Sequence, residues 1–341
     1  MHDAIKKQLD TYSHVMVYGE YAQHPSVELC KLLAANLPAP LSKTYLVNSG
    51  TEAIEGALKL ARRVTGRSQL LSCHNAYHGN TMGSLSVMGY EERKTVFQPL
   101  IPDVDFITFN NEADLEKITT KTAGILLETI QGGAGFIEPK DDFLKKVRQK
   151  CNETGTLLIL DEIQPGFGRT GKLFGFQNYD IVPDIVVMGK GMGGGMPVGA
   201  FTAAPEMMDL LSHDPKLGHI TTFGGHPVIA AACLATLQEL TETSIMEDVL
   251  EKEIIFRKLL QHSLIKEVRG RGLMLALMTD SAAITNEIIL RCHQRGLILF
   301  WLLFEETAVR ITPPLTISIE EIEKGCTLLL SVLNEIEKEM S

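Results

Sequence analysis

Short apolar runs alternate with helical patterns over the first two thirds of the chain. The runs are rich in Val, Ile and Leu and fall at residues 44–47, 69–73, 104–109, 125–130, 157–160, 185–188 and 198–203. Apolar positions three and four apart predict helices at residues 1–10, 26–37 with Ser26 as the N-cap, 51–66, 112–118, 142–153 and 226–240. Apolar strands separated by helices are typical of βαβ units. The pattern therefore predicts a largely parallel sheet, with 198–203 as a candidate antiparallel strand.

The pattern changes after residue 240. A charged helix over residues 245–260 precedes a strand at 273–278, a helix from 284, apolar runs at 297–304 and 309–312, and an amphipathic helix from 318. This order predicts a smaller α+β domain. A chain of 341 residues is long enough for two domains, so we expect a large domain over 1–240 and a small C-terminal domain over 241–341.

Charge and cysteine usage exclude several classes of protein. The formal net charge of −10 argues against a nucleic-acid or anionic-membrane partner. The longest apolar run, at 297–304, is far too short to span a bilayer, and the N-terminus has no apolar segment typical of a signal peptide. The six cysteines form no Cys-x-x-Cys pair, which fits reduced thiols better than disulfides or a zinc site. We expect a cytoplasmic protein without a metal site.

One lysine directly follows an expected buried strand. Pro183 and Gly189 limit the apolar run at 185–188 to strand length, and Lys190 comes next in a glycine-rich loop. Open α/β sheets bind their ligands at the carboxyl ends of such strands. A single loop lysine is more often an ordinary surface residue, so the interpretation of Lys190 depends on the other sites.

A carboxylate ends the preceding expected strand. Asp161 follows the apolar run at 157–160, where an unpaired buried charge would be costly. It is therefore paired or functional, unless it only caps the next turn. One crossover separates Asp161 from Lys190, so two strands could bring a carboxylate and an amine to one crevice.

Two turns combine a hydroxyl side chain with glycine. Gly50 and Thr51 stand at the start of an expected helix, where backbone N–H groups and the helix dipole favour an anion such as phosphate. An ordinary helix start, with Ser49 or Thr51 as the cap, fits that stretch equally well. Thr222 precedes two glycines and the helix at 226–240, and it is a second candidate phosphate ligand.

Three further side chains are candidates. Tyr77 follows a strand and could cover a flat heterocycle, although a turn tyrosine that covers the core is the simpler interpretation. His74 and His78 are four residues apart, but the loop between them is not helical, so we do not expect a metal pair. Arg310 alternates with apolar neighbours and could bind a substrate carboxylate bidentately, or it could form a surface ion pair on an edge strand.

Two glycine motifs are misleading. Residues 166–172 match the spacing of a P-loop, but Leu173 stands where Ser or Thr should hold magnesium, and no apolar strand leads into the loop. Residues 189–194 match G-x-G-x-x-G, yet no helix follows. We therefore expect neither an NTPase nor a dinucleotide-binding fold.

Taken together, the chain resembles the class III (ornithine/acetylornithine/ω-amino acid) aminotransferases, which are pyridoxal-phosphate enzymes of fold type I. The stretches that match are Asn48-Ser49-Gly50-Thr51-Glu52-Ala53, Tyr77-His78-Gly79, Asp161-Glu162-Ile163-Gln164, Gly168-Arg169-Thr170-Gly171, Lys190, Thr222-Phe223-Gly224-Gly225 and Arg310-Ile311-Thr312-Pro313-Pro314. They occur in the order of the family and run over almost the whole chain. The resemblance implies a mixed, mostly parallel seven-stranded sheet in the large domain and a smaller α+β domain.

The resemblance also implies roles around pyridoxal 5'-phosphate. Lys190 would carry the internal aldimine and then move a proton between the substrate and the cofactor. Asp161 would keep the pyridine nitrogen protonated, Gln164 would reach the ring hydroxyl, and Tyr77 would stack on the ring. His78 belongs to the same cofactor-binding set.

The other implied roles concern the phosphate and the substrate. Gly50 and Thr51 would bind the phosphate through their amides, and Thr222 would reach the phosphate of the neighbouring subunit. The resemblance thus implies a homodimer with a shared active site. Arg310 would hold the carboxylate of 2-oxoglutarate or glutamate. The implied reaction moves an amino group from an ω-amino or α-amino donor, similar to ornithine or acetylornithine, to a 2-oxo acid.

Two departures from the family keep alternatives open. Gly133 stands where the family usually has a glutamate that pairs with the substrate arginine, and the chain starts after the point where the family's N-terminal arm would be. The first departure leaves an aminomutase, racemase or decarboxylase of the same fold as an alternative. The second leaves a truncated homologue that binds the cofactor without turnover. The sequence does not identify the amino donor.

Overall fold

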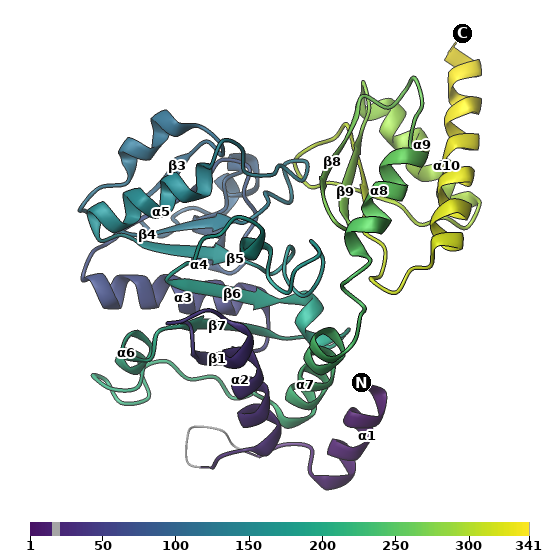
Figure 1. Ribbon diagram of the computed structural model, residues 1–341. Coiled ribbons are helices and arrows are strands. Elements are labelled where there is room, and N and C mark those ends of the chain that lie inside the picture. The colour runs from purple at the N-terminus through teal and green to yellow at the C-terminus, as the bar shows by residue number, and fades with distance from the viewer. Residues whose placement is uncertain (16–20, 341) are drawn as a thin grey trace.

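Two sheets organise the chain in the computed structural model, which describes residues 1–15 and 21–340 (Figure 1). The larger sheet has the strand order β1-β7-β6-β5-β4-β2-β3. Its strands are β1 (Lys43–Val47), β2 (Gln69–Cys73), β3 (Val104–Ile107), β4 (Thr122–Glu128), β5 (Leu157–Asp161), β6 (Ile185–Gly189) and β7 (Gly199–Ala203). β7 pairs antiparallel with both β6 and β1, and the pairs among β2 to β6 are parallel. The mixed, mostly parallel seven-stranded sheet is therefore confirmed.

Helices cover both faces of this sheet, which explains why its central strands are almost wholly buried. The helices of this region are α1 (His2–Thr11), α2 (His24–Asn36), α3 (Gly50–Thr65), α4 (Met82–Ser86), α5 (Phe143–Thr154), α6 (Pro205–Met208) and α7 (Pro227–Glu242). In β5, Leu158 and Leu160 pack in a cluster with α2, α5 and α7, whereas Ile159 packs in a cluster with α3. Alternate side chains of one strand thus fill two cores.

α3 shows how local sequence fixes an element beside the site. The Ser49 side chain accepts a hydrogen bond from the Glu52 amide at 3.4 Å, and Gly66 ends the helix in the left-handed conformation with φ 68°. In the middle of the helix, a Cβ on Gly56 would lie 2.3 Å from Cε1 of Phe201 in β7. The glycine therefore lets the helix approach the sheet closely.

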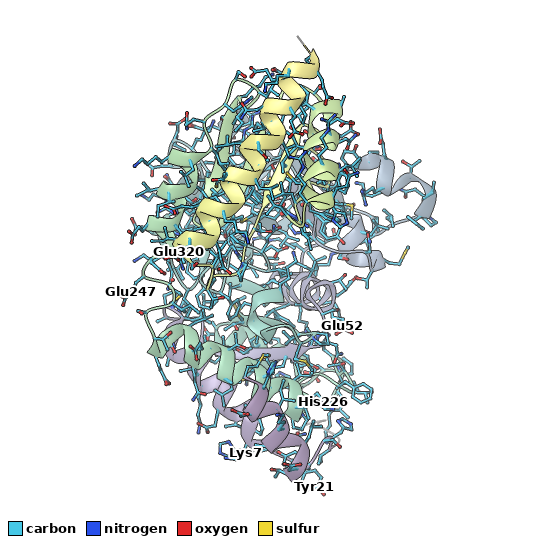
Figure 2. All side chains as sticks on the ribbon, turned by 90° about the vertical axis from the view of Figure 1, so that its right-hand side faces the viewer. Lys7, Tyr21, Glu52, His226, Glu247 and Glu320 are labelled. Carbon is cyan, nitrogen blue, oxygen red and sulfur yellow. The ribbon has the colours of Figure 1, made fainter. Side chains whose placement is uncertain are left out.

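The second sheet belongs to the C-terminal part of the chain and has the order β10-β11-β9-β8. Its elements are α8 (Val249–Leu259), β8 (Glu267–Arg271), β9 (Met274–Met278), α9 (Ala282–Gln294), β10 (Phe300–Trp301), β11 (Ala308–Ile311) and α10 (Ile319–Met340). Figure 2 shows α10, which starts near Glu320, at the end of the molecule opposite to Lys7 and Tyr21. The smaller α+β unit is present, while the division between residues 240 and 241 stays a prediction.

Some expected elements are wrong in detail. Ser26 does not cap a helix: α2 begins at His24, and the Ser26 hydroxyl donates to the Gly225 carbonyl at 2.7 Å. Residues 112–118 form a 3-10 helix, η3 (Glu112–Lys117), rather than an α-helix. The apolar run at 297–304 contains only the two-residue strand β10, because the residues after it turn towards the large sheet.

Two findings bear on the expected class of protein. Each of the six cysteines is a free thiol, with no disulfide between them. Within residues 1–15 and 21–340, no helix combines the length and the apolar character that crossing a membrane requires.

Candidate active site

A cavity of about 610 Å³ lies where several strands of the large sheet end. Its lining includes Glu128 at the end of β4, Asp161 at the end of β5 and Lys190 directly after β6. Leu303 and Arg310 of the small sheet region form another part of the wall. The site therefore requires both parts of the chain.

Strand register brings the chemically active groups of the large sheet together. Glu128 of β4 pairs with Asp161 of β5, and Asp161 in turn pairs with Val187 of β6. Lys190 follows that strand at once, so it emerges at the same edge of the sheet as the two carboxylates. Parallel strands whose carboxyl ends meet explain why residues so distant in sequence share one cavity.

Lys190 has an unusual backbone conformation. It begins the 3-10 turn η5 (Lys190–Gly193) with φ 43°, in the left-handed region that side chains other than glycine, asparagine and aspartate rarely adopt. Such backbone strain is concentrated at functional sites and persists only where the surroundings fix it. The lysine side chain is exposed to the cavity, where an amine can react.

Asp161 is buried and its carboxylate is held from two sides. One oxygen accepts a hydrogen bond from the Ile163 amide at 3.0 Å, and the other accepts one from Nδ1 of His78 at 2.8 Å. The His78 side chain is fully buried, and its Nε2 has no hydrogen-bond partner among the described residues. A carboxylate can only accept, so Nδ1 of His78 must carry a hydrogen.

The start of α3 forms another part of the cavity wall. Gly50 and Thr51 line the cavity, and the first N–H groups of a helix have no acceptor within the helix. The Thr51 hydroxyl is already engaged, with Oγ of Ser84 at 2.6 Å and Oγ1 of Thr81 at 2.8 Å. An anion there would therefore be bound by backbone amides at a positive helix end.

Two further predicted site residues belong to this cavity. Tyr77 and Gln164 both line it. A Cβ on Gly132 would lie 2.6 Å from Oε1 of Gln164 and 3.0 Å from Oε1 of Glu128, so no larger residue fits there without displacing one of them. The absence of a side chain at Gly132 thus leaves space for the Gln164 and Glu128 side chains.

Glu128 is a site carboxylate that sequence reasoning did not select. Burial raises its pKa to about 7, and the neighbouring His78 opposes part of that increase. Its oxygens accept from the amides of Gly132 at 3.0 Å and Tyr77 at 3.4 Å. In the structure Glu128 ends β4 as Asp161 ends β5, whereas the apolar run in the sequence continues to residue 130.

A second buried glutamate has a structural role. Burial also raises the pKa of Glu162 to about 7, although its oxygens accept hydrogen bonds from the Thr129 hydroxyl and from the amides of Gly175 at 2.6 Å and Phe176 at 2.9 Å. Glu162 does not line the cavity, so it fixes the chain after β5 rather than contacting a ligand.

Arg310 supplies the positive charge on the small-domain side. It lies in β11, is half-buried, and has its guanidinium carbon 4.9 Å from the centre of the Phe300 ring. Burial lowers the pKa of Arg310 from its ordinary value. Leu302 and Leu303, which the sequence reasoning did not single out as site residues, form the apolar wall near it.

The structure brings most, but not all, of the predicted site residues together. Eight of them line this one cavity: Gly50, Thr51, Tyr77, His78, Asp161, Gln164, Lys190 and Arg310. Thr222 does not line it and is exposed, while the adjacent Thr221 contacts the Asn48 amide group at 3.0 Å.

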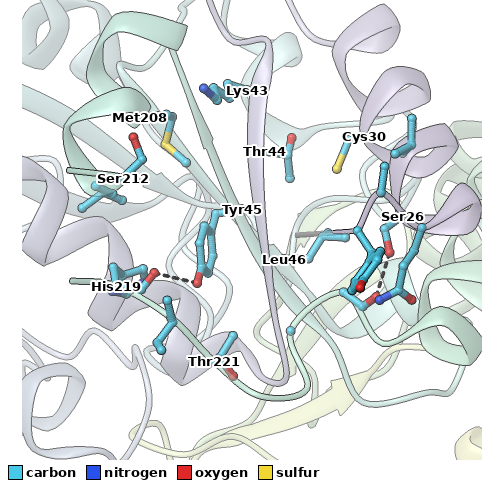
Figure 3. Close-up of a pocket in the computed structure, with 18 of the residues that line it drawn as sticks. Ser26, Cys30, Lys43, Thr44, Tyr45, Leu46, Met208, Ser212, His219 and Thr221 are labelled. Atoms are coloured by element: carbon cyan, nitrogen blue, oxygen red, sulfur yellow. Dashed lines mark hydrogen bonds between the residues drawn. The ribbon is translucent and has the colours of Figure 1, made fainter. Parts of the chain in front are cut away.

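A larger cavity of about 810 Å³ contains none of these residues. It lies beside β1, at the edge of the large sheet, and includes Cys30, Tyr45 and His219 (Figure 3). The Tyr45 hydroxyl donates to the His219 carbonyl at 2.9 Å. Size alone therefore does not identify the site; the buried carboxylates and the lysine do.

Comparisons with known proteins point to one family. The family model described as Aminotransferase class-III matches residues 1–333. An acetylornithine aminotransferase of Caldanaerobacter subterraneus subsp. tengcongensis is 37% identical over 346 residues, which cover 98% of this chain and 85% of that protein. A LysW-aminoadipate semialdehyde/glutamate semialdehyde transaminase of Sulfolobus acidocaldarius is 35% identical over 338 residues, with coverages of 98% and 85%. A solved ornithine aminotransferase of Toxoplasma gondii, with partial occupancy of PLP at its active site, has a TM-score of 0.92 and 28% identity and covers 99% of this chain and 82% of that chain.

Proposed function

Because the chain belongs to the class-III aminotransferase family, we propose that it transfers the amino group of an ornithine-like or acetylornithine-like donor to 2-oxoglutarate. The match over residues 1–333 confirms the resemblance seen in the sequence, and with it a pyridoxal-phosphate-dependent aminotransferase of fold type I. The observation that best supports the proposed chemistry is the position of Lys190 and Asp161 at the ends of neighbouring strands in one cavity.

The cavity residues fit pyridoxal phosphate. When bound, the cofactor supplies an aldehyde that receives the amino group and a ring that withdraws electrons from the substrate carbon. Asp161 would place its buried carboxylate at the ring nitrogen, and the α3 N-terminus would offer its amides to the phosphate. Tyr77 is the residue to cover the ring, and Gln164 is the residue to donate to its hydroxyl.

Lys190 is the proposed nucleophile and proton carrier. Its Nζ would hold the cofactor covalently and, with a substrate amine bound, would accept and return a proton at the substrate carbon. The left-handed backbone at Lys190 fixes the direction in which the side chain leaves β6. A fixed backbone position helps a lysine that must serve as both nucleophile and base, because it limits the positions that Nζ can take.

His78 is the proposed positioning residue for Asp161. Its Nδ1–H bond and the Ile163 amide fix both carboxylate oxygens, so Asp161 would be held in place to accept a hydrogen bond from the pyridine nitrogen. Glu128 lies next to Asp161 in the sheet and, with its pKa near 7, limits how much negative charge gathers there.

A homodimer with a shared active site is part of the proposal. Thr222 is exposed and lies outside the cavity of its own chain, which supports a role at the phosphate of a second copy. Mixing a Thr222→Ala chain with a Lys190→Ala chain tests this: each hybrid dimer would combine one intact site with one doubly altered site, so activity should reappear on mixing. A cytoplasmic location also remains a prediction.

The decisive experiment follows the cofactor during each half of the exchange. The purified protein with pyridoxal phosphate should be yellow, and borohydride should fix the cofactor to the peptide that contains Lys190. An amine donor alone should bleach the aldehyde absorbance, and 2-oxoglutarate should restore it. A mutase, racemase or decarboxylase would turn over without that lasting change, and a protein that only binds the cofactor would show no turnover.

A further inference from the structure

A loop over residues 166–173 reaches from the large sheet to the small sheet. It follows closely after Gln164, which lines the cavity, but no residue of the loop itself lines the cavity. The Gly166 amide donates to the Glu162 carbonyl at 3.0 Å, next to Asp161 at the end of β5. The start of the loop is therefore fixed relative to the cofactor end of the site.

The tip of this loop packs closely against the small sheet region. Gly168 and Gly171 have φ values of 85° and 83°. A Cβ on Gly168 would lie 2.8 Å from Cδ1 of Leu315, and one on Gly171 would lie 2.9 Å from Cγ of Leu250. The two glycines thus permit both the left-handed backbone and the close approach.

Arg169, at the tip, binds two strands of the small sheet. Its Nη1 donates to the Leu273 carbonyl at 3.1 Å and to the Pro313 carbonyl, and the Leu273 amide donates back to the Arg169 carbonyl at 2.9 Å. Leu273 directly precedes β9, and Pro313 follows the end of β11. One guanidinium therefore holds the adjacent ends of two paired strands.

The charge of Arg169 has no acidic partner in residues 1–15 and 21–340. The acceptors of its guanidinium are the two backbone carbonyls, and burial lowers the pKa of Arg169 from its ordinary value. Burying a charge without an opposite charge is unfavourable. Stability alone therefore does not account for an arginine at this position.

The strand ends that Arg169 holds are those beside Arg310. Arg310 lies in β11 and pairs with Ala276 of β9. Only two residues separate it from Pro313, and proline restricts the backbone between the two contacts. A shift of the Pro313 carbonyl would therefore move the backbone that carries the Arg310 side chain.

A second bond ties the small sheet to the cavity rim. The Phe304 amide donates to the Gly133 carbonyl at 3.0 Å, and Gly133 lines the cavity. This bond lies in the segment between β10 and β11, whereas the Arg169 contacts lie at the other end of β11. The strand that carries Arg310 is therefore fixed at both of its ends.

We propose that Arg169 is a positioning residue that sets the span between Arg310 and Lys190. A carboxylate on Arg310 is then placed so that the reacting carbon lies beside Lys190. This inference rests on the proposed function, with Arg310 as the residue that holds the carboxylate of the acceptor. Arg169 does not line the cavity, so it acts only through the strands that it holds.

Two acceptors isolate this effect in the holoenzyme. Propanal and 2-oxobutyrate carry the same ethyl group, but only 2-oxobutyrate has a carboxylate beside its carbonyl. Each is added to enzyme that has already taken the amino group from a donor, and the recovery of the cofactor aldehyde absorbance gives kcat/KM. In Arg169→Met, the value should fall at least about 10-fold for 2-oxobutyrate and less than about 2-fold for propanal, because only the carboxylate depends on the position of Arg310.

A double-mutant cycle separates positioning from a general loss of structure. In an Arg310→Met background, Arg169→Met should cost less than about 2-fold with 2-oxobutyrate, because no guanidinium remains to be placed. Arg169→Lys keeps a charged donor for one carbonyl and should retain part of the preference for 2-oxobutyrate. Lys172→Met is the matched control: it removes an exposed cation from the same loop and should leave both acceptors unchanged.

The outcomes separate this inference from the proposed function. Equal losses for both acceptors in Arg169→Met, or a loss that persists in the Arg310→Met background, overturn the positioning role and leave the aminotransferase intact. An unchanged preference in Arg310→Met alone overturns it too. If circular dichroism shows that Arg169→Met has not folded, Arg169→Lys replaces it in the same cycle, with an expected selective loss of at least about 3-fold. If no amine and no oxo acid changes the cofactor of the parent enzyme, the proposed function itself is wrong.

Discussion

Replacing His78 removes the side chain that donates a hydrogen bond to Asp161. The bond from Nδ1 is 2.8 Å long, and both partners are buried, with 0% and 5% of their side chains exposed. Hydrogen bonds to charged groups contribute about 1.5–3 kcal/mol, and solvent cannot replace this one. If the whole free energy of this hydrogen bond stabilises the transition state, His78→Leu should lower kcat/KM by about 10- to 100-fold.

A matched variant separates the hydrogen bond from the ring. In His78→Asn, the amide nitrogen can take the place of Nδ1, so much of the donor function is kept while the rest of the imidazole is lost. The rate at which a donor bleaches the cofactor aldehyde, measured with excess pyridoxal phosphate, should follow the order parent, Asn, Leu. In an Asp161→Asn background the same His78→Leu change should cost much less, because a neutral amide needs the donor less.

Two results would refute this reasoning. If His78→Leu reacts as fast as the parent enzyme, the hydrogen bond does not orient a catalytic charge. If the Asn and Leu variants are equally slow, the imidazole acts through its shape or through Nε2, the atom that has no partner among the described residues.

Further predictions concern the lysine, the buried glutamate and the packing of α3. Lys190→Ala should lose at least about 100-fold in the donor half-reaction, because nucleophile and base are removed together, and borohydride should no longer label the peptide around position 190. Burial raises the pKa of Glu128 from 4.5 to about 7, so its contribution to stability is greatest below pH 4.5 and is lost as pH rises to about 7. Relative to the parent, the unfolding free energy of Glu128→Gln should therefore rise by about 3 kcal/mol between pH 4.5 and about pH 8, measured by urea titration; a difference that does not change with pH would contradict this. Gly56→Ala should lower the unfolding free energy by about 1–3 kcal/mol, because its Cβ would lie 2.3 Å from the Phe201 ring, and thermal melting should show whether Phe201 can move instead.

Much of the fold could be predicted because it depends on local pattern. β5 is apolar up to its last residue, Asp161, and β6 is apolar up to Gly189, so Asp161 and Lys190 could be placed at strand ends. The sequence also indicated residues 198–203 as a candidate antiparallel strand, and β7 pairs antiparallel with β6.

The remainder depends on contacts between distant segments. β8 was not expected because its sequence, with charged residues at both ends, shows no apolar alternation and becomes a strand only by pairing with β9. Glu128 was not selected because its burial comes from the assembled sheet. Likewise, the Phe304 ring contacts Tyr90 and Gly133, which lie far away in sequence.

The bond between the Phe304 amide and the Gly133 carbonyl has a consequence for motion. It spans the rim of the cavity, so the two parts of the chain cannot separate there without exposing this amide to water. Its rate of exchange with deuterium therefore measures how often the rim opens. A substrate bridging Arg310 and Lys190 would hold both sides together and slow that exchange, which makes one backbone proton a reporter of occupancy.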